Sequence, residues 1–257
     1  MDADRQSPER PSPLGPGASA PWPTVRAAWR PRGWFALVCL ALFALITADL
    51  FADGFLPHID RATASSMRHL DIRHRPVIGV IGYVLTQTGG RGPNLILLLL
   101  LSGMIAFQQR TFAPLVRALL ATGLLSVIML AAKPIFGRTA PAYGADLLHN
   151  ANGMSFPSGH QANAILLSAV GAWIAADYVR QQWLRRCAFW YAIIAPIIAS
   201  ISVLLMNYHW LSDIIAGACL AVCLLWMLRA VFASKVGMQF ERALGSKPTS
   251  SATDSQR

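Results

Sequence analysis

The sequence predicts an all-α protein, a polytopic membrane helical bundle with about six transmembrane helices. The 257-residue chain is 54% hydrophobic and only 13% charged, which is typical of a membrane protein and excludes an ordinary soluble domain. Its apolar residues also form long runs, and about 20 such residues can cross a bilayer as a helix. The six expected spans cover roughly residues 34–50, 94–107, 113–132, 161–176, 188–206 and 211–231.

The first run is expected to stay in the protein as a span. It starts too far from the N-terminus for a signal peptide, and no small-residue cleavage site follows it. Residues 77–85 are apolar but too short to cross, so we expect an interfacial or partly inserted helix there. Residues 62–74 fit either an amphipathic surface helix or a solvated connector, and the connector is slightly favoured.

The composition divides the chain into three parts: a disordered cytoplasmic tail over residues 1–32, a six-span domain over 33–232, and a cytoplasmic C-terminal tail over 233–257. The start of the chain is rich in Pro, Ser and Gly, and its last residues are rich in Ser and Thr. Such segments cannot bury enough apolar surface to fold.

The net charge of +10 predicts an orientation rather than a nucleic-acid partner, because the basic residues are spread along the chain beside the spans. They precede the first span, follow the second, fourth and sixth, and include Arg30, Arg32, Arg110, Arg180, Arg185, Arg186, Lys235 and Arg242. By the positive-inside rule these segments and both termini are cytoplasmic. We therefore expect a multi-pass protein of the cell (plasma or inner) membrane. The first outward segment also carries arginines, but it is long enough to escape the rule.

Three short polar segments fall on the outward side, each at the end of an apolar run: residues 133–141, 156–160 and 207–213. Ionisable groups in such places are costly unless they have a function. The second segment reads Phe-Pro-Ser-Gly-His and stands directly before a span. A helix start offers unpaired backbone N–H groups and the positive end of the helix dipole, where phosphate binds well.

Within this turn, Gly159 lets a ligand approach the backbone and Ser158 adds a hydroxyl. His160 beside a bound anion can pass a proton to a leaving group. The alternative interpretation is a plain helix-capping turn with an interfacial histidine.

His209 and Asp213 stand at the head of the last span, and their spacing of four puts both on one helix face. The carboxylate can hold the imidazole in one tautomer, and a histidine so oriented can act as a nucleophile. Lys133 and Arg138 close the third span on the outward side, against the charge bias. Taken separately, an interfacial histidine with a helix-starting Asp, and cations snorkelling at a helix end, explain these pairs equally well.

Together the three segments resemble the motif triplet of the type 2 phosphatidic acid phosphatase superfamily, over roughly residues 113–225. Members of that family are six-span membrane lipid phosphatases with an extracytoplasmic active site. The resemblance implies that His209, oriented by Asp213, is the nucleophile that forms a phosphohistidine, and that His160 is the general acid. It assigns phosphate binding to Lys133, Arg138, Ser158 and Gly159. It implies no metal and no other cofactor, because the cations and helix-terminus donors supply the charge stabilisation.

Two positions depart from the family pattern, which has an arginine where this chain has Ala140 and Val203. A charge-assisted hydrogen bond is worth about 1.5–3 kcal/mol, and one such transition-state contact is roughly a ten- to hundredfold rate factor. The sequence therefore predicts a slower enzyme, or one with an altered phosphate ester or acceptor, and the same two losses keep a catalytically silent member as an alternative.

The predicted function is an integral membrane lipid phosphatase that acts on an isoprenoid diphosphate, phosphatidic acid or phosphatidylglycerol phosphate. Two alternatives stay open: a lipid phosphotransferase with the same site, and a catalytically silent member that binds lipid. A channel or pump is disfavoured, because no span carries an acidic relay at mid-membrane. The expected partners are the phosphorylated lipid and the bilayer. The sequence defines neither the lipid headgroup nor the oligomeric state.

Overall fold

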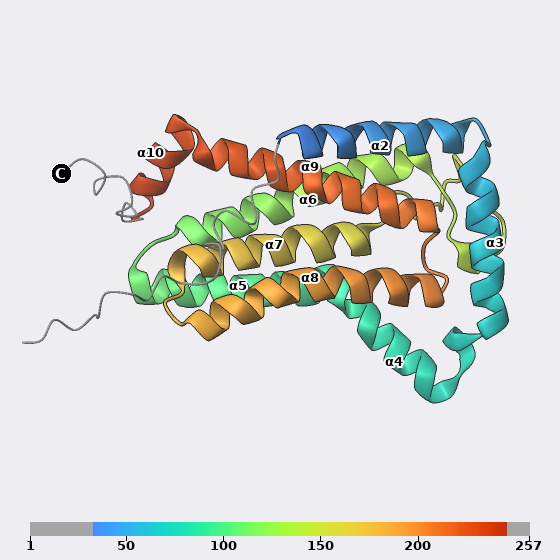
Figure 1. Cartoon of the computed structure of the whole chain (residues 1–257), viewed down its shortest axis with the longest axis horizontal. Helices are drawn as coiled ribbons and strands as arrows, with labels where there is room; N and C mark the ends of the chain where they lie inside the picture. The colour runs from blue at the N-terminus through green and yellow to red at the C-terminus, as the bar shows by residue number, and fades with distance from the viewer. Residues whose placement is uncertain (1–32, 246–257) are drawn as a thin grey trace, which may run out of the picture.

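The computed structural model describes residues 33–245. The predicted N-terminal tail, residues 1–32, and the last part of the predicted C-terminal tail, residues 246–257, lie outside the described residues. All regular structure within residues 33–245 is helical (Figure 1), which confirms the predicted all-α fold class. The helices are α2 (Gly33–Phe51), α3 (Phe55–Leu70), α4 (Pro76–Thr86), α5 (Arg91–Gln109), α6 (Ala113–Phe136), α7 (Gly159–Tyr178), α8 (Gln182–Leu205), α9 (Leu211–Ala233) and α10 (Lys235–Ala243). Three short 3₁₀ turns, η1 (Ile72–His74), η2 (Gln87–Gly89) and η3 (Pro141–Tyr143), complete the described chain.

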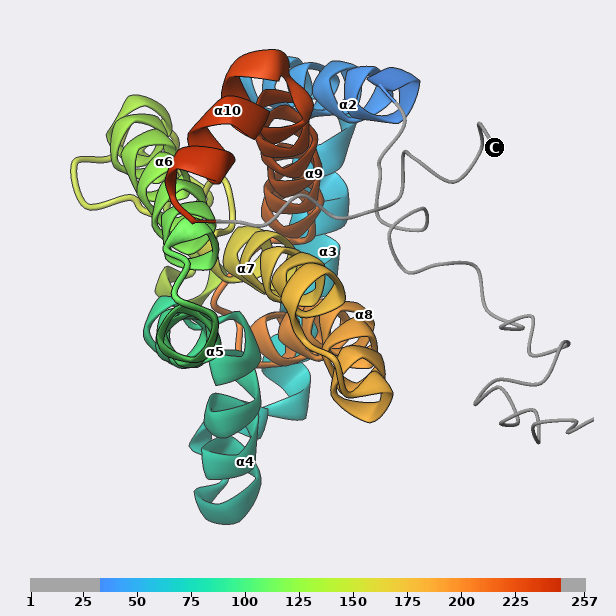
Figure 2. The same ribbon diagram turned by 90° about the vertical axis from the view of Figure 1, so that its left-hand side faces the viewer.

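Each of the six expected spans corresponds to one long helix. By length and composition, five of them can cross a membrane: α2, α5, α6, α8 and α9. The remaining one, α7, lies in the middle of the bundle against α5, α6, α8 and α9 (Figure 2), and most of its residues are buried. A helix enclosed by other helices presents little surface to lipid, so it can carry polar residues such as Asn163 and Ser168 that a lipid-facing helix would exclude.

Small residues let the helices around α7 pack closely. Ala118, Ala121, Ala162, Ala169 and Ala221 are all at most 1% exposed in the main core cluster. Close approach of backbones replaces the hydrophobic effect as the source of helix association in a bilayer. The large apolar side chains instead point outward along α2, α5, α6 and α8, as expected for a surface that meets lipid.

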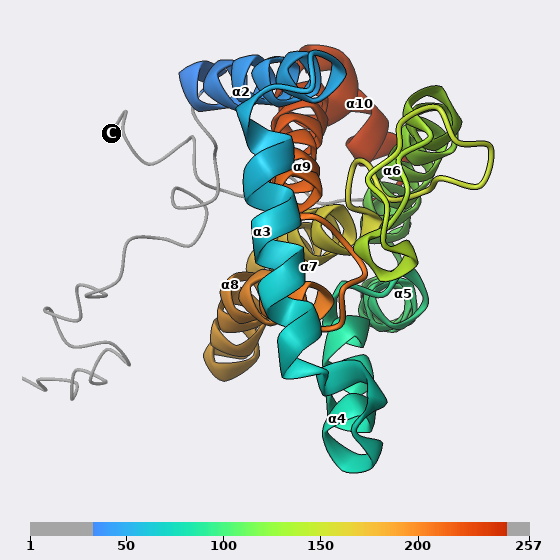
Figure 3. The same ribbon diagram turned by 90° about the vertical axis from the view of Figure 1, so that its right-hand side faces the viewer.

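The alternating chain direction gives the bundle two distinct ends. One end collects the last turns of α2, α6 and α8 and the first turns of α5, α7 and α9, and α3 lies across it (Figure 3). Helix α10 lies at the opposite end (Figure 1). All three polar segments of the sequence therefore fall on the end that α3 covers.

Two shorter helices sharpen the sequence-based predictions. Helix α4 matches the predicted short apolar helix, and most of its side chains are exposed, among them Val77, Val80 and Val84. Residues 62–70 continue helix α3, so the favoured connector interpretation is wrong for them, and only the following residues form a connector. The helix is strongly amphipathic and buries Asp60 against α9, where the Asp60 carboxylate accepts from the Ser212 N–H. At the C-terminal end, residues 235–243 of the segment expected as a tail form helix α10.

At the end opposite α3, Arg117 joins three helices. The guanidinium of Arg117 (α6) is 2.7 Å from an Asp177 oxygen (α7) and 2.6 Å from a Glu241 oxygen (α10). It also stacks 4.3 Å from the ring centre of Trp173. With only 6% of its side chain exposed, this cation is the central charge of a buried cluster that fixes α10 to the bundle.

We expect Arg117→Ala to destabilise the protein by about 3–5 kcal/mol, because two largely buried carboxylates lose the cation between them. The measurement is the thermal unfolding midpoint in detergent. Arg180→Ala, which removes an exposed arginine at the same end, is the matched control and should change stability by less than about 0.5 kcal/mol. Equal unfolding midpoints for the two variants would contradict a structural role for the cluster.

Candidate active site

The three polar segments meet at the end of the bundle that α3 covers. Lys133 lies in the last turn of α6, Gly159 and His160 open α7, and His209 stands just before α9. The Lys133 Nζ lies 3.8 Å from the place that a Cβ on Gly159 would occupy. His160 Nδ1 is 3.4 Å from His209 Nε2. The structure thus brings together side chains that are up to 76 positions apart in the sequence.

The surroundings of His209 distinguish its two ring nitrogens. On one side, Nδ1 is 3.6 Å from Asp213 Oδ2 and 3.4 Å from Ser155 Oγ. A carboxylate beside Nδ1 favours the tautomer that carries its proton there, which leaves a lone pair on Nε2. The Nε2 atom faces His160. His209 is therefore arranged so that Nε2 can attack an electrophile held next to His160.

The carboxylate that faces His209 is itself held from several directions. Asp213 is fully buried, and its Oδ1 accepts a 2.7 Å hydrogen bond from Arg138 Nη1. Its Oδ2 accepts a 3.1 Å bond from the Trp210 backbone N–H and a further bond from the Ser155 hydroxyl. These contacts fix the carboxylate beside His209 before any ligand arrives.

Arg138 reaches this place because the chain reverses directly before it. Gly137 caps the end of helix α6; it has a positive φ of 52°, and its N–H donates to the Lys133 carbonyl at 2.8 Å. A Cβ on Gly137 would lie 2.8 Å from the Asn150 carbonyl oxygen, so only glycine fits this crossing. The loop between α6 and α7 folds back onto Arg138, and the Ser155 N–H of this loop donates to the Arg138 carbonyl at 2.9 Å.

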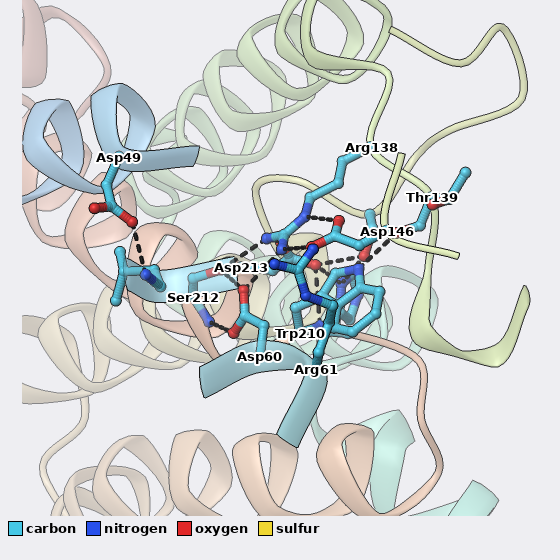
Figure 4. Close-up of polar contacts among 12 residues, drawn as sticks. Asp49, Asp60, Arg61, Arg138, Thr139, Asp146, Trp210, Ser212 and Asp213 are labelled. Atoms are coloured by element: carbon cyan, nitrogen blue, oxygen red, sulfur yellow. Dashed lines mark hydrogen bonds and ion pairs between the residues drawn. The ribbon is translucent and has the colours of Figure 1, made fainter. Parts of the chain in front are cut away.

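Arg138 does not have the position expected of a phosphate-binding residue. Its side chain is fully buried, and all five N–H donors of the guanidinium have protein acceptors (Figure 4). These acceptors belong to Asp60, Asp146, Ser212 and Asp213, at 2.7–2.9 Å. No donor is left for a phosphate oxygen, so the prediction that Arg138 binds phosphate is corrected. Arg138 instead fixes the positions of the buried carboxylates.

The start of α7 provides the donors that the sequence pattern predicts. The Ser158 hydroxyl caps the helix by accepting from the Gln161 N–H at 3.3 Å, and the Ser158 N–H donates to the Asp213 carbonyl at 3.0 Å. Within residues 33–245, the N–H groups of Gly159 and His160 have no acceptor. Two backbone donors beside Lys133 are thus available to an anion.

Ser158 is more deeply placed than the sequence suggests. Its side chain is fully buried and serves as the helix cap. The α9 backbone approaches it closely, since a Cβ on Gly217 would lie 2.4 Å from the Ser158 carbonyl oxygen. Phosphate contact by the Ser158 hydroxyl stays a prediction, whereas Gly159 and His160 are half-buried and accessible.

Several residues of the site were missed by sequence reasoning. Asp60 from α3 accepts from the Ser212 N–H at 3.0 Å and so caps α9. Asp146 and Ser155 come from the loop between α6 and α7. In the sequence, Asp60 is one of several acidic residues in a mixed-charge segment, and Asp146 and Ser155 have no special spacing. Only their contacts with Arg138 and Asp213 identify them.

A cavity of about 290 Å³ adjoins the site. Its walls include Arg68, Arg73, His74 and Asn207 but neither catalytic candidate histidine. Arg73 stacks 5.5 Å from the centre of the Tyr208 ring, which in turn lies 6.5 Å from the His160 ring. The two positions at which the family that the sequence resembles has an arginine lie in the same region: Val203 is fully buried in the last turn of α8, and Ala140 directly precedes η3.

Comparison with known proteins finds one matching family model and one similar fold. Residues 114–236, which contain all three polar segments, match the family model of the PAP2 superfamily. The structure is similar to the crystal structure of the first transmembrane PAP2 type phosphatidylglycerolphosphate phosphatase from Bacillus subtilis, with a TM-score of 0.59 and 20% identity. The match covers 75% of this chain and 94% of that one, and at this identity it shows a shared fold. No curated protein sequence matches the chain.

Proposed function

We propose that this protein is a lipid phosphatase, because residues 114–236 match the PAP2 superfamily model and the chain is a multi-pass membrane protein. It hydrolyses a phosphomonoester or diphosphate of a lipid through a phosphohistidine on His209. One observation carries the proposal. His209 presents Nε2 to His160 and Nδ1 to Asp213, next to the two free N–H groups of α7 and the Lys133 ammonium.

In the first step His209 Nε2 attacks phosphorus, and the bond from phosphorus to the lipid oxygen breaks. His160 gives its proton to that departing oxygen. The nonbridging oxygens lie against Lys133 and the N–H groups of Gly159 and His160, which stabilise the charge that develops on them. Because His160 Nδ1 and His209 Nε2 are only 3.4 Å apart, the phosphoryl group must separate these two nitrogens as it enters.

In the second step His160 takes a proton from a water molecule, and the oxygen of that water attacks the phosphorus. The P–N bond breaks, inorganic phosphate leaves, and His209 regains its lone pair. Asp213 stays ionised throughout and stabilises the positive charge on the His209 ring. Each histidine thus returns to its starting protonation state.

The position of the site favours a lipid substrate. It lies at the ends of membrane-crossing helices and beside the exposed apolar surface of α4, so a lipid can enter sideways with its headgroup at Lys133. The basic residues Arg110, Arg185 and Lys235 lie at the opposite end of the bundle. By the positive-inside rule that end is cytoplasmic and the site faces outward. Isoprenoid diphosphate, phosphatidic acid and phosphatidylglycerol phosphate are the three candidate substrates.

The test is release of inorganic phosphate in detergent from these three lipids, with and without a strong chelator. We expect release from at least one lipid and less than a twofold change on adding the chelator, because Lys133 and the α7 N-terminus supply the charge stabilisation. Loss of activity with chelator, restored by Mg²⁺, would contradict the metal-independent mechanism. Transfer of the phosphate to a lipid alcohol in place of release would identify a phosphotransferase with the same site.

A further inference from the structure

The buried part of the site has a surplus of negative charge. Asp60, Asp146 and Asp213 surround the single positive charge of Arg138, which gives the group a net charge of −2. The four side chains are at most 6% exposed, so water screens this charge weakly. A lipid phosphate brings further negative charge to the same place. Lys133 alone leaves part of this negative charge without an opposing charge, so a second cation beside it would favour phosphate binding.

Arg91 is placed to be that cation. It is the first residue of α5, directly after η2 and the Gly89-Gly90 pair. The η2 turn packs against the first turn of α7 so closely that a Cβ on Gly89 would lie 2.6 Å from the His160 carbonyl oxygen. The exposed side chain of Arg91 thus starts two residues from a backbone contact with the candidate general acid.

Arg91 and Lys133 form a pair of like charges. Arg91 is near enough to Lys133 for its charge to disfavour the protonated ammonium, and the Asp213 carboxylate acts on Lys133 in the opposite direction. Within residues 33–245, neither cation has a carboxylate at ion-pair distance. Two neighbouring cations without a counterion repel each other, and an anion between them removes that repulsion. The nearby N–H groups of Gly159 and His160 favour the same anion.

We propose that Arg91 is a phosphate-binding residue of this site, which holds the nonbridging oxygens of the lipid phosphate together with Lys133. The proposal rests on the proposed phosphatase function. A guanidinium can bind two oxygens of one phosphate through parallel N–H donors, a geometry that an ammonium does not offer. The PAP2 pattern has an arginine at the position of Ala140, so this chain lacks a positive charge there. Arg91 would supply a positive charge to the site from a different helix.

The test compares Arg91→Gln with Arg75→Gln, which removes an exposed arginine from the same outward part of the chain. We expect Arg91→Gln to lower kcat/KM about ten- to hundredfold, the effect of one lost charge-assisted hydrogen bond. Arg75→Gln should stay within twofold of the wild type. Arg91→Lys should recover part of the loss, because it keeps the charge and loses the second donor. Equal kcat/KM for Arg91→Gln and Arg75→Gln would overturn the proposal.

A second readout does not depend on turnover. Inorganic phosphate should raise the thermal unfolding midpoint of the wild type and of Arg75→Gln, because a ligand that binds the folded state stabilises it. Arg91→Gln should need at least tenfold more phosphate for the same shift. If the wild type binds phosphate in this way but releases none from any lipid, the phosphatase function fails while the assignment of Arg91 stands. An unchanged phosphate dependence in Arg91→Gln would remove Arg91 from the site even if the enzyme is active.

Discussion

Replacing His209 with alanine is expected to abolish phosphate release, with a loss in kcat on the order of 10³ or more, as for the nucleophile of other covalent mechanisms. His209 Nε2 lies 3.4 Å from His160 Nδ1 and carries the lone pair for the attack. The Nδ1 atom of His209 is directed at the buried Asp213 carboxylate. No other described side chain combines these two contacts. The fold should survive, because the His209 ring makes no hydrogen bond that closes a helix end.

The measurement pairs steady-state phosphate release with trapping of the intermediate. After a brief reaction with a ³²P-labelled lipid, denatured wild-type protein should carry label in an acid-labile, base-stable bond, as expected for a P–N linkage. His209→Ala protein should carry none. His58→Ala, which removes an exposed histidine on α3, is the matched control and should label like the wild type. Label that persists in His209→Ala would place the covalent bond on another residue.

Much of the candidate site could be predicted from the sequence, because its motifs coincide with helix ends. The boundary of an apolar run fixes where a span begins or stops, so Lys133, Gly159, His160 and His209 could be assigned to one side of the membrane without a structure. The same apolar runs predicted the six long helices. The central position of α7 could not be predicted, since its apolar run resembles the others and only packing shows that other helices enclose it.

The carboxylates of the site lay beyond sequence reasoning for a different reason. Asp60 reaches Ser212 across 152 positions, and Asp146 reaches Arg138 only because the loop after Gly137 folds back. No periodicity or motif spacing encodes such contacts. The error about Arg138 has the same origin. A cation near a phosphate motif suggests phosphate binding, and only the three carboxylates and the Ser212 hydroxyl around it show that its donors are already used.

Arg138→Gln is therefore expected to damage both the fold and the chemistry. Removing the cation leaves Asp60, Asp146 and Asp213 buried together without their common partner, at a cost of about 3–5 kcal/mol. Asp213 also loses the bond that fixes it beside His209, so kcat should fall by at least about tenfold in the protein that folds. Arg61→Gln breaks only an exposed 3.5 Å pair with Asp53 and should change stability by less than about 1 kcal/mol.

A second substitution separates this positioning role from phosphate binding. If Arg138 acts by neutralising carboxylates, adding Asp146→Asn to Arg138→Gln should recover part of the lost unfolding midpoint and part of kcat, because one buried charge is removed with its partner. KM should change little in either variant, since no Arg138 donor faces the substrate. A direct phosphate ligand would behave in the opposite way. Arg138→Gln would then raise KM at an unchanged unfolding midpoint, and Asp146→Asn would restore nothing.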